Sequence, residues 1–219
     1  MSDHTLAVVA PGTPTDVVGE WAAALGVPVE IDEVIDPVGD LDPRRRWPSP
    51  AGAAAVLQID GHDAMTIDRV TAGREESLLG VIFVQRRELL REGFRAETTG
   101  ARHGLSQLSF VAPRAGITAA AFVERYQRHM DVVREEHPGV AHYRQDVIVR
   151  SLGVAPSLSV SAAVSQLWFP TADDFGRRYY ASSSSADIVR ADVSTFLDYP
   201  RTWSVLTHEH HLAPRATDH

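Results

Sequence analysis

One histidine stands on the buried stripe of an expected helix, one turn after a tyrosine. His129 and Tyr126 are three residues apart, so their side chains share one face of a helix expected over about 118–136. An imidazole gains and loses a proton near neutral pH, and a phenol donates a hydrogen bond. We therefore predict proton transfer, with His129 as general base or acid and Tyr126 as donor to developing oxyanion charge. The alternative is a neutral core histidine hydrogen-bonded to a carbonyl group.

The stripe that carries His129 has the spacing of an α-helix. Its members, at relative positions 0, 4, 7, 8 and 11, are Phe122, Tyr126, His129, Met130 and Val133. The corresponding helix near the start of the chain has only Val18, Trp21 and Leu25 on its inner face, and none of these ionises. We therefore expect the chemistry to lie beneath the second helix and not beneath the first.

Further side chains are expected to line a cavity beneath this helix. On the strand expected at about 160–168, Gln166 and Trp168 share one face with Ala162 and Val164, and this small pair leaves room beneath a helix. For Gln166, a structural hydrogen bond with Gln58 is the alternative, and for Trp168 ordinary core packing. The predicted substrate-binding residues are Phe122, Met130, Trp168, Gln166, His142, Tyr143 and Tyr179.

The residue types that are missing exclude several chemistries. Cysteine and lysine are both absent, which excludes thiol nucleophiles, thiolate ligands and Schiff bases. The motifs G-x-G-x-x-G, G-x-x-x-x-G-K-[ST], G-x-S-x-G and H-E-x-x-H are absent as well. Near the C-terminus, His208 and His210 alternate onto one side of a strand, but zinc needs three or four ligands and the sequence suggests no third. We expect neither a metal nor a cofactor.

The composition is that of an ordinary globular protein with an excess of acid. The net charge is −8, and no basic stripe suggests a nucleic-acid partner. No apolar run approaches the roughly 18 residues of a membrane span, and the N-terminus lacks the features of a secretory signal. We expect a cytoplasmic protein whose partner is a small apolar substrate, with no nucleic-acid or membrane partner.

Short segments of the first half return in the second half in the same order. A repeat with a period near half the chain indicates two copies of one unit. The three echoes, at offsets of 102, 108 and 113, are Leu6–Pro11 with Leu108–Pro113, Ala54–Ile59 with Ala162–Leu167, and more loosely Asp32–Ile35 with Gln145–Ile148.

Each half is expected to follow the order βαββαβ. Such a unit forms a four-stranded antiparallel sheet with helices on one face, and its other apolar face must be covered. We predict an α+β fold in which two fused ferredoxin-like modules form a pseudo-dimeric α+β barrel, as a monomer or as a homodimer of it. The expected divisions are a degenerate module at 1–90, a linker at 91–104, a second module at 105–212 and a flexible tail at 213–219.

Four pieces of the second half resemble one known family. They are Phe122–Val133, Glu136–Tyr143, Gln166–Phe169 and Ser194–Asp198. In this order they are similar to the EthD group of dimeric α+β barrel proteins, with its F-x-x-x-W-x-x-x-H-x-P-L, P-G-x-x-x-Y, E-x-W-F and F-x-D segments. The resemblance covers about residues 105–211. Tyr126 replaces the family's tryptophan and Gln166 its acid. Counted back from Pro138, the family histidine falls on Met130, and a shift of one residue places it on His129.

The resemblance implies an enzyme whose relatives include cofactor-free cyclases, dehydratases and monooxygenases. We predict a cofactor-independent lyase or isomerase that acts by proton transfer on an aromatic or polyketide-like molecule. One alternative is a monooxygenase, cofactor-free or with haem on His129. Another is a small-molecule-binding module without catalysis.

Overall fold

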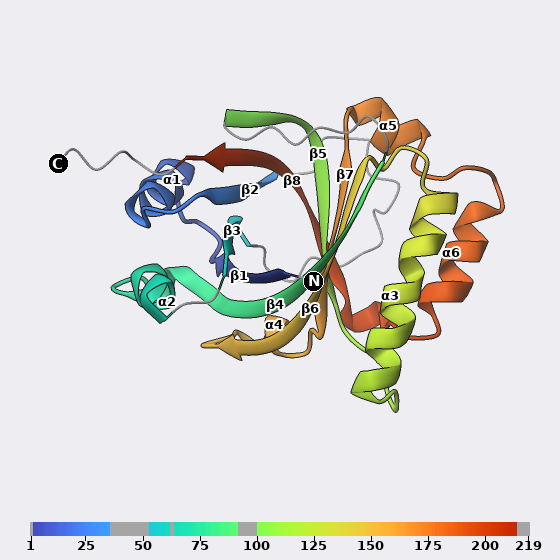
Figure 1. The fold of residues 1–219 in the computed structure, drawn as a ribbon, viewed down its shortest axis with the longest axis horizontal. Helices are drawn as coiled ribbons and strands as arrows, with labels where there is room; N and C mark the ends of the chain where they lie inside the picture. Colours follow the sequence, from blue (N-terminus) through green and yellow to red (C-terminus); the bar gives the residue numbers. More distant parts are fainter. Residues whose placement is uncertain (1, 36–52, 62–63, 92–99, 214–219) are drawn as a thin grey trace.

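The computed structural model describes residues 2–35, 53–61, 64–91 and 100–213. Within these residues, eight antiparallel strands close into one barrel in the order β1-β3-β2-β8-β5-β7-β6-β4 (Figure 1). The strands are β1 (Ser2–Val9), β2 (Val29–Ile35), β3 (Ala55–Asp60), β4 (Leu78–Leu90), β5 (Gly100–Val111), β6 (His142–Leu152), β7 (Ala163–Phe169) and β8 (Trp203–Leu212). The predicted α+β barrel is confirmed at this level.

Helices lie outside the barrel on two sides. Figure 1 shows α1 and α2 on one side and the longer pair α3 and α6 on the other. The helices are α1 (Thr15–Ala24), α2 (Ala64–Thr71), α3 (Ala119–Glu136), α4 (Pro156–Ser159), α5 (Ala172–Arg177) and α6 (Ser185–Val193), with 3₁₀ turns η2 (Glu75–Ser77) and η3 (Tyr199–Arg201). None of these helices is long and apolar enough to cross a membrane.

Local signals in the sequence explain where α3 begins and which face it buries. The Thr118 hydroxyl accepts a hydrogen bond from the backbone N–H of Ala121, so the first turn is capped. The helix ends at Glu136, before Pro138. Its buried residues are Phe122, Tyr126, His129, Met130 and Val133, the stripe expected from the sequence.

The two halves of the chain arrange their strands alike. The first half has the order β4-β1-β3-β2 and the second the order β8-β5-β7-β6, and the halves join through the pairs β2–β8 and β4–β6. The predicted linker is partly strand, because β5 begins at Gly100, and residues 92–99 lie outside the described residues. The predicted module boundaries, the tail and the common origin of the halves stay predictions.

The strand ladders define which residues of the halves correspond. Gln58 pairs with Leu6 on one side and Glu30 on the other, whereas Gln166 pairs with Leu108 and Arg144. Glu30 and Arg144 therefore occupy matching positions. The offsets of 102 and 108 agree with the ladders. The looser echo differs from the ladders by one residue. Asp32 lies opposite Val56 and Asp146 lies opposite Val164, so Asp32 and Asp146 match at an offset of 114 and not 113.

The interior of the barrel is apolar at one end and charged at the other. Trp203 stacks on Phe110 with ring centroids 4.0 Å apart in the apolar layer, whose other members include Leu6, Val8, Val56, Ile82, Val84, Leu108, Val164 and Val205. The charged layer contains Glu30, Asp32, Gln58, Arg86, Arg102, Arg144, Asp146, Gln166 and Glu209. The inner faces of the strands thus form this two-part interior, and much of their outer faces is covered by helices.

Candidate functional site

The layer between sheet and helices differs sharply between the two halves. In the first half it is apolar, with Val18, Leu57, Ile59 and Phe83 among its members. In the second half the corresponding layer contains buried hydroxyl, amide and imidazole groups, namely those of Gln107, Ser109, Tyr126, His129, Tyr143, Gln145, Ser165 and Tyr179. Polar groups in such a layer cost free energy unless they are hydrogen-bonded, so their concentration in one half marks a candidate site.

A histidine–aspartate dyad lies at the edge of this layer. His129 Nδ1, on α3, is 2.7 Å from Asp192 Oδ2, on α6. In the tautomer that donates Nδ1–H to this carboxylate, the lone pair of the ring lies on Nε2. The side chain of His129 is 11% exposed and that of Asp192 is 30% exposed. A histidine held by a carboxylate in this way is the arrangement in which an imidazole acts as a general base.

Aromatic rings fix the imidazole in place. The Tyr143 ring meets it edge-on at 6.3 Å, and the Phe196 ring lies 5.6 Å away. Burial raises the pKa of the Tyr143 phenol to about 12, so this hydroxyl stays a hydrogen-bond donor at neutral pH. The group beside the dyad is thus suited to stabilise an oxyanion.

Gln145 adds an unsatisfied acceptor to the layer. Its Nε2 donates to the Tyr143 hydroxyl at 3.2 Å and to the backbone carbonyl of Tyr126. Its Oε1 is buried and has no hydrogen-bond partner among the described residues. A buried acceptor without a donor is costly, and a hydroxyl group of a bound molecule would satisfy it.

Tyr126, the predicted donor, is anchored to the sheet. Its hydroxyl donates to the Val164 carbonyl at 2.9 Å and lies 2.8 Å from Ser165 Oγ. The side chain is fully buried against β7, and burial raises its pKa well above the ordinary value. This geometry gives Tyr126 a structural hydrogen bond, and its predicted catalytic role stays a prediction.

We expect Tyr126→Phe to lower the free energy of unfolding by about 1–2 kcal/mol, because the buried Val164 carbonyl loses its side-chain donor. Turnover should stay within about threefold of the parent if the phenol only anchors α3, a small change on the energy scale of catalysis. Chemical denaturation and steady-state rates measure the two quantities. A large loss of turnover at unchanged stability would instead assign the hydroxyl to the reaction.

The structure separates the predicted substrate-binding residues onto two sides of the sheet. Phe122, Met130, Tyr143 and Tyr179 lie with His129 in the layers between sheet and helices. Gln166 and Trp168 point into the barrel, as does His142, whose Nε2 is 3.5 Å from a carboxylate oxygen of Glu88. These latter three do not share a cavity with His129. Every residue of β7 is buried, so alternation along this strand could not show which face meets the helix.

The hydrogen bonds of Gln166 agree with the alternative considered from the sequence, a structural hydrogen bond with Gln58. Gln58 Nε2 donates to Gln166 Oε1 at 3.0 Å, across the barrel from β3 to β7. Gln166 Nε2 donates in turn to Asp32 Oδ1 at 2.9 Å and to Glu209 Oε1 at 3.0 Å. The two glutamines therefore bridge opposite walls of the charged layer.

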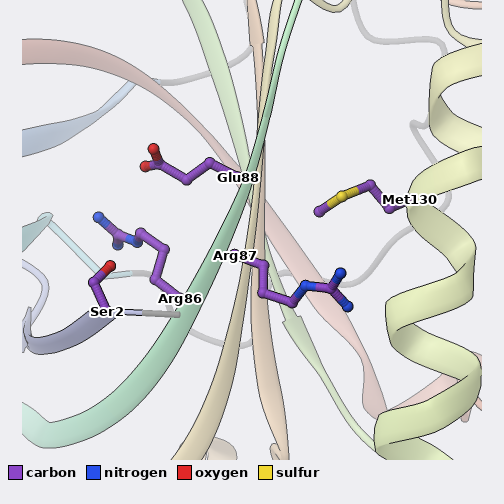
Figure 2. Close-up of a pocket in the computed structure, with 5 residues that line it drawn as sticks. All are labelled: Ser2, Arg86, Arg87, Glu88 and Met130. Atoms are coloured by element: carbon purple, nitrogen blue, oxygen red, sulfur yellow. The ribbon is translucent and has the colours of Figure 1, made fainter.

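A pocket of about 450 Å³ opens beside β4, close to the dyad's helix. Its lining comprises Ser2, Arg86, Arg87, Glu88 and Met130. Figure 2 shows Arg86 and Glu88 on the barrel side of β4 and Arg87 and Met130 on the side of α3. His129 is not part of the lining, although Met130 is its neighbour in the chain. Met130 therefore faces the pocket and His129 pairs with Asp192.

Ion pairs between neighbouring strands and one pair across the barrel stabilise the charged layer. Arg86 donates to both carboxylate oxygens of Asp146 at 2.7 Å, and Arg144 donates to Glu30 on the opposite strand. Gly104, at φ 120°, lies in an irregularity of β5 that sets Arg102 opposite Glu209. Arg102 Nη1 is 2.5 Å from Glu209 Oε2. Sequence reasoning missed this layer, because charged residues in a strand ordinarily indicate a solvated face.

The ionisation of the Glu30 carboxyl group makes the stability of the charged layer depend on pH. Burial alone would raise its pKa, but the charge and hydrogen bond of Arg144 lower the pKa to about 2 from an ordinary value of 4.5. Because the pKa of Glu30 is lower in the folded state than in the unfolded state, the ionised carboxylate stabilises the fold above pH 4.5. This contribution is lost as the pH falls from 4.5 toward 2. We expect the stability difference between the parent and Glu30→Gln to shrink over this range. Denaturation at a series of pH values measures it, and a constant difference would contradict the assignment.

No protein-family model matches the sequence, and no curated protein matches it. Solved structures do match in fold. An anthrone oxidase-like protein has a TM-score of 0.63 and 8% identity, over 98% of this chain and 94% of that one. A major regulator of staphylococcal pathogenesis has a TM-score of 0.51 and 9% identity, over 94% and 97% of the two chains. The haem-degrading enzyme of Listeria monocytogenes has a TM-score of 0.44 and 8% identity, over 95% and 98%.

The first two similarities, with TM-scores above 0.5, are similarities of fold alone. They agree with the closed α+β barrel that the sequence led us to expect. Membership of the EthD group is not shown. At such low identity the neighbours' activities do not transfer to this chain, and the function is argued from the site.

Proposed function

We propose that the chain is a cofactor-independent enzyme that moves a proton on a hydroxylated aromatic or polyketide-like molecule. The molecule binds between α3, α6 and the sheet of the second half. The observation that carries the proposal is the His129–Asp192 dyad at 2.7 Å. A carboxylate that holds Nδ1–H leaves Nε2 as a base and stabilises the imidazolium that forms.

The residues around the dyad suggest the course of the reaction. His129 Nε2 takes a proton from a carbon next to a carbonyl group, and the electron pair moves onto the carbonyl oxygen. The neutral Tyr143 phenol can stabilise this oxygen. Gln145 Oε1 accepts a hydrogen bond from a substrate hydroxyl. Return of the proton to another atom gives isomerisation or cyclisation, and loss of a hydroxyl group as water gives dehydration.

The similarity to an anthrone oxidase-like protein favours an oxygen-dependent second candidate. In such a reaction the same carbanion reacts with dioxygen. The ring CH₂ becomes a carbonyl, one oxygen atom enters the product and the other leaves as water. Both candidates begin with removal of the same kind of proton, so one substrate can distinguish them.

Haem on His129, the alternative considered from the sequence, would use the same dyad, because a histidine that ligates a metal through Nε2 commonly donates its Nδ1–H to a carboxylate. A Soret band in the visible spectrum of the purified protein would support haem, and a colourless protein would support the cofactor-independent reaction. We derive no step through haem.

Anthrone tests the proposal, because its CH₂ group is acidic and lies between aromatic rings. Without oxygen, the protein should accelerate exchange of these hydrogens with deuterium from solvent, which proton NMR measures. In air, formation of anthraquinone with consumption of dioxygen would support the oxygenase, whereas exchange alone would support the lyase or isomerase. Binding without exchange above the buffer rate would show a module without catalysis and overturn the proposal.

A further inference from the structure

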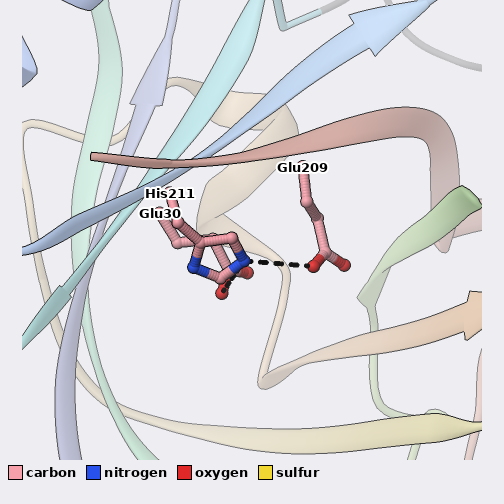
Figure 3. Close-up of side chains that lie close together, drawn as sticks. All are labelled: Glu30, Glu209 and His211. Atoms are coloured by element: carbon pink, nitrogen blue, oxygen red, sulfur yellow. Dashed lines mark ion pairs between the residues drawn. The ribbon is translucent and has the colours of Figure 1, made fainter. Parts of the chain in front are cut away.

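Three potential metal ligands meet at the charged end of the barrel. Glu30 lies on β2, and Glu209 and His211 lie on the neighbouring strand β8. His211 Nε2 is 3.8 Å from Glu30 Oε2 and 3.7 Å from Glu209 Oε2. Figure 3 marks the ion pairs that join the imidazole to each of the two carboxylates. Among the described residues, this is the group of histidine and acidic side chains close enough to bind one ion.

The three atoms are too far apart for hydrogen bonds, which in proteins reach about 3.2 Å. His211 Nε2 is buried and has no hydrogen-bond partner among the described residues. Zinc lies about 2.0–2.2 Å from nitrogen and oxygen ligands, so tetrahedral ligands stand about 3.3–3.6 Å apart. Small side-chain movements would bring these atoms from 3.7 and 3.8 Å to that spacing.

Neighbouring donors orient each carboxylate toward the histidine. Arg144 binds Glu30 through Oε1, which leaves Oε2 facing His211. Gln166 and Ser106 bind Glu209 through Oε1. Arg102 binds Glu209 Oε2, and a carboxylate oxygen has a second lone pair for an ion. Outer partners of this kind commonly fix metal-binding carboxylates.

We propose that Glu30, Glu209 and His211 bind a divalent first-row transition-metal cation, with Zn²⁺ as the probe. One imidazole nitrogen and two carboxylate oxygens suit Zn²⁺ or Mn²⁺. Three protein ligands leave at least one position open to water or to a small anion. The His211 side chain is 16% exposed, so the site lies close to the protein surface. The proposal does not depend on the function proposed for the His129 site.

The two histidines considered from sequence lie elsewhere. His208 is exposed, with Nδ1 2.9 Å from the Gly104 carbonyl oxygen, and His210 Nε2 is 3.3 Å from Glu33. The ladder turns His211 and Glu209 inward instead, and Glu30 comes from the other half of the chain. Sequence spacing could not indicate a ligand so far away.

Isothermal titration of the full chain with ZnCl₂ tests the site. We expect one equivalent to bind, with a rise in melting temperature. His211→Ala should weaken this binding at least about a hundredfold, because loss of an outer partner alone costs 10–100-fold. The matched control is His208→Ala, which removes an exposed histidine of the same strand and should bind as the parent does.

Cobalt provides a second readout that does not depend on affinity. Co²⁺ bound to protein ligands should give visible absorption bands that His211→Ala loses and His208→Ala keeps. If His211→Ala does not fold, Glu30→Gln replaces it, and the same loss is expected. Absence of binding by the parent, or equal binding by His211→Ala, would overturn the proposal and leave an imidazole that only neutralises two carboxylates.

Discussion

Replacing His129 with alanine should lower turnover of a bound substrate about 10²–10⁴-fold, the usual contribution of a positioned general base. The variant removes the nitrogen that would accept the proton and leaves Asp192 without its partner. Its effect should fall on kcat and on kcat/KM alike, because the base acts in the transition state. Deuterium exchange into anthrone measures the proton-transfer step directly.

Two further variants separate chemistry from folding. Asp192→Asn keeps the shape of the dyad but can present an N–H to Nδ1, which favours the wrong tautomer, so the rate should fall in the same direction. His208→Ala removes an exposed histidine and should leave the rate unchanged. Parental exchange rates in a folded His129→Ala variant would reject His129 as the base.

Replacing Arg144 with methionine should lower the free energy of unfolding by about 3–5 kcal/mol, since it leaves a buried carboxylate without its cation. The guanidinium donates to Glu30 and to Gln166, at 3.0 Å for the latter, and both it and Glu30 are buried inside the barrel. Glu30 keeps its charge at neutral pH because Arg144 lowers its pKa to about 2. Equilibrium unfolding in urea measures the loss.

A double variant tests whether the pair itself accounts for that loss. Glu30→Met with Arg144→Met removes both charges and should be more stable than Arg144→Met alone. Arg128→Met is the control, because Arg128 lies on the surface of α3, 3.4 Å from Glu124, and an exposed pair contributes at most about 1 kcal/mol. Equal losses for Arg144→Met and Arg128→Met would contradict the importance of the cross-barrel pair.

Much of the fold could be predicted from the sequence because its strong signals are local. Apolar strands, capped helices and the internal echoes predict the element order and the closed α+β barrel. The echoes also relate Gln58 to Gln166, whose hydrogen bond crosses the barrel. The extent of β5 was not predictable, since Gly100 and the polar residues after it are typical of a linker and gain strand structure through pairing with β8.

The site was predictable only in part. Helical spacing placed His129 on the buried stripe, as observed. Helical spacing could not identify Asp192 as the partner of His129, because Asp192 lies 63 residues later and its position in the sequence is typical of a surface charge. The sequence analysis also grouped Trp168 with His129. Both faces of β7 are buried, so the alternation of its residues does not show which face meets the helix. Contacts between distant elements decide both points.

Two pairs of matching positions in the two halves carry opposite charges, Glu30 against Arg144 and Arg86 against Glu209. Two first halves brought together would oppose Glu30 to a second Glu30, and two second halves Arg144 to a second Arg144. We therefore expect a fragment released by proteolysis or by incomplete synthesis to pair better with its complement than with its own kind.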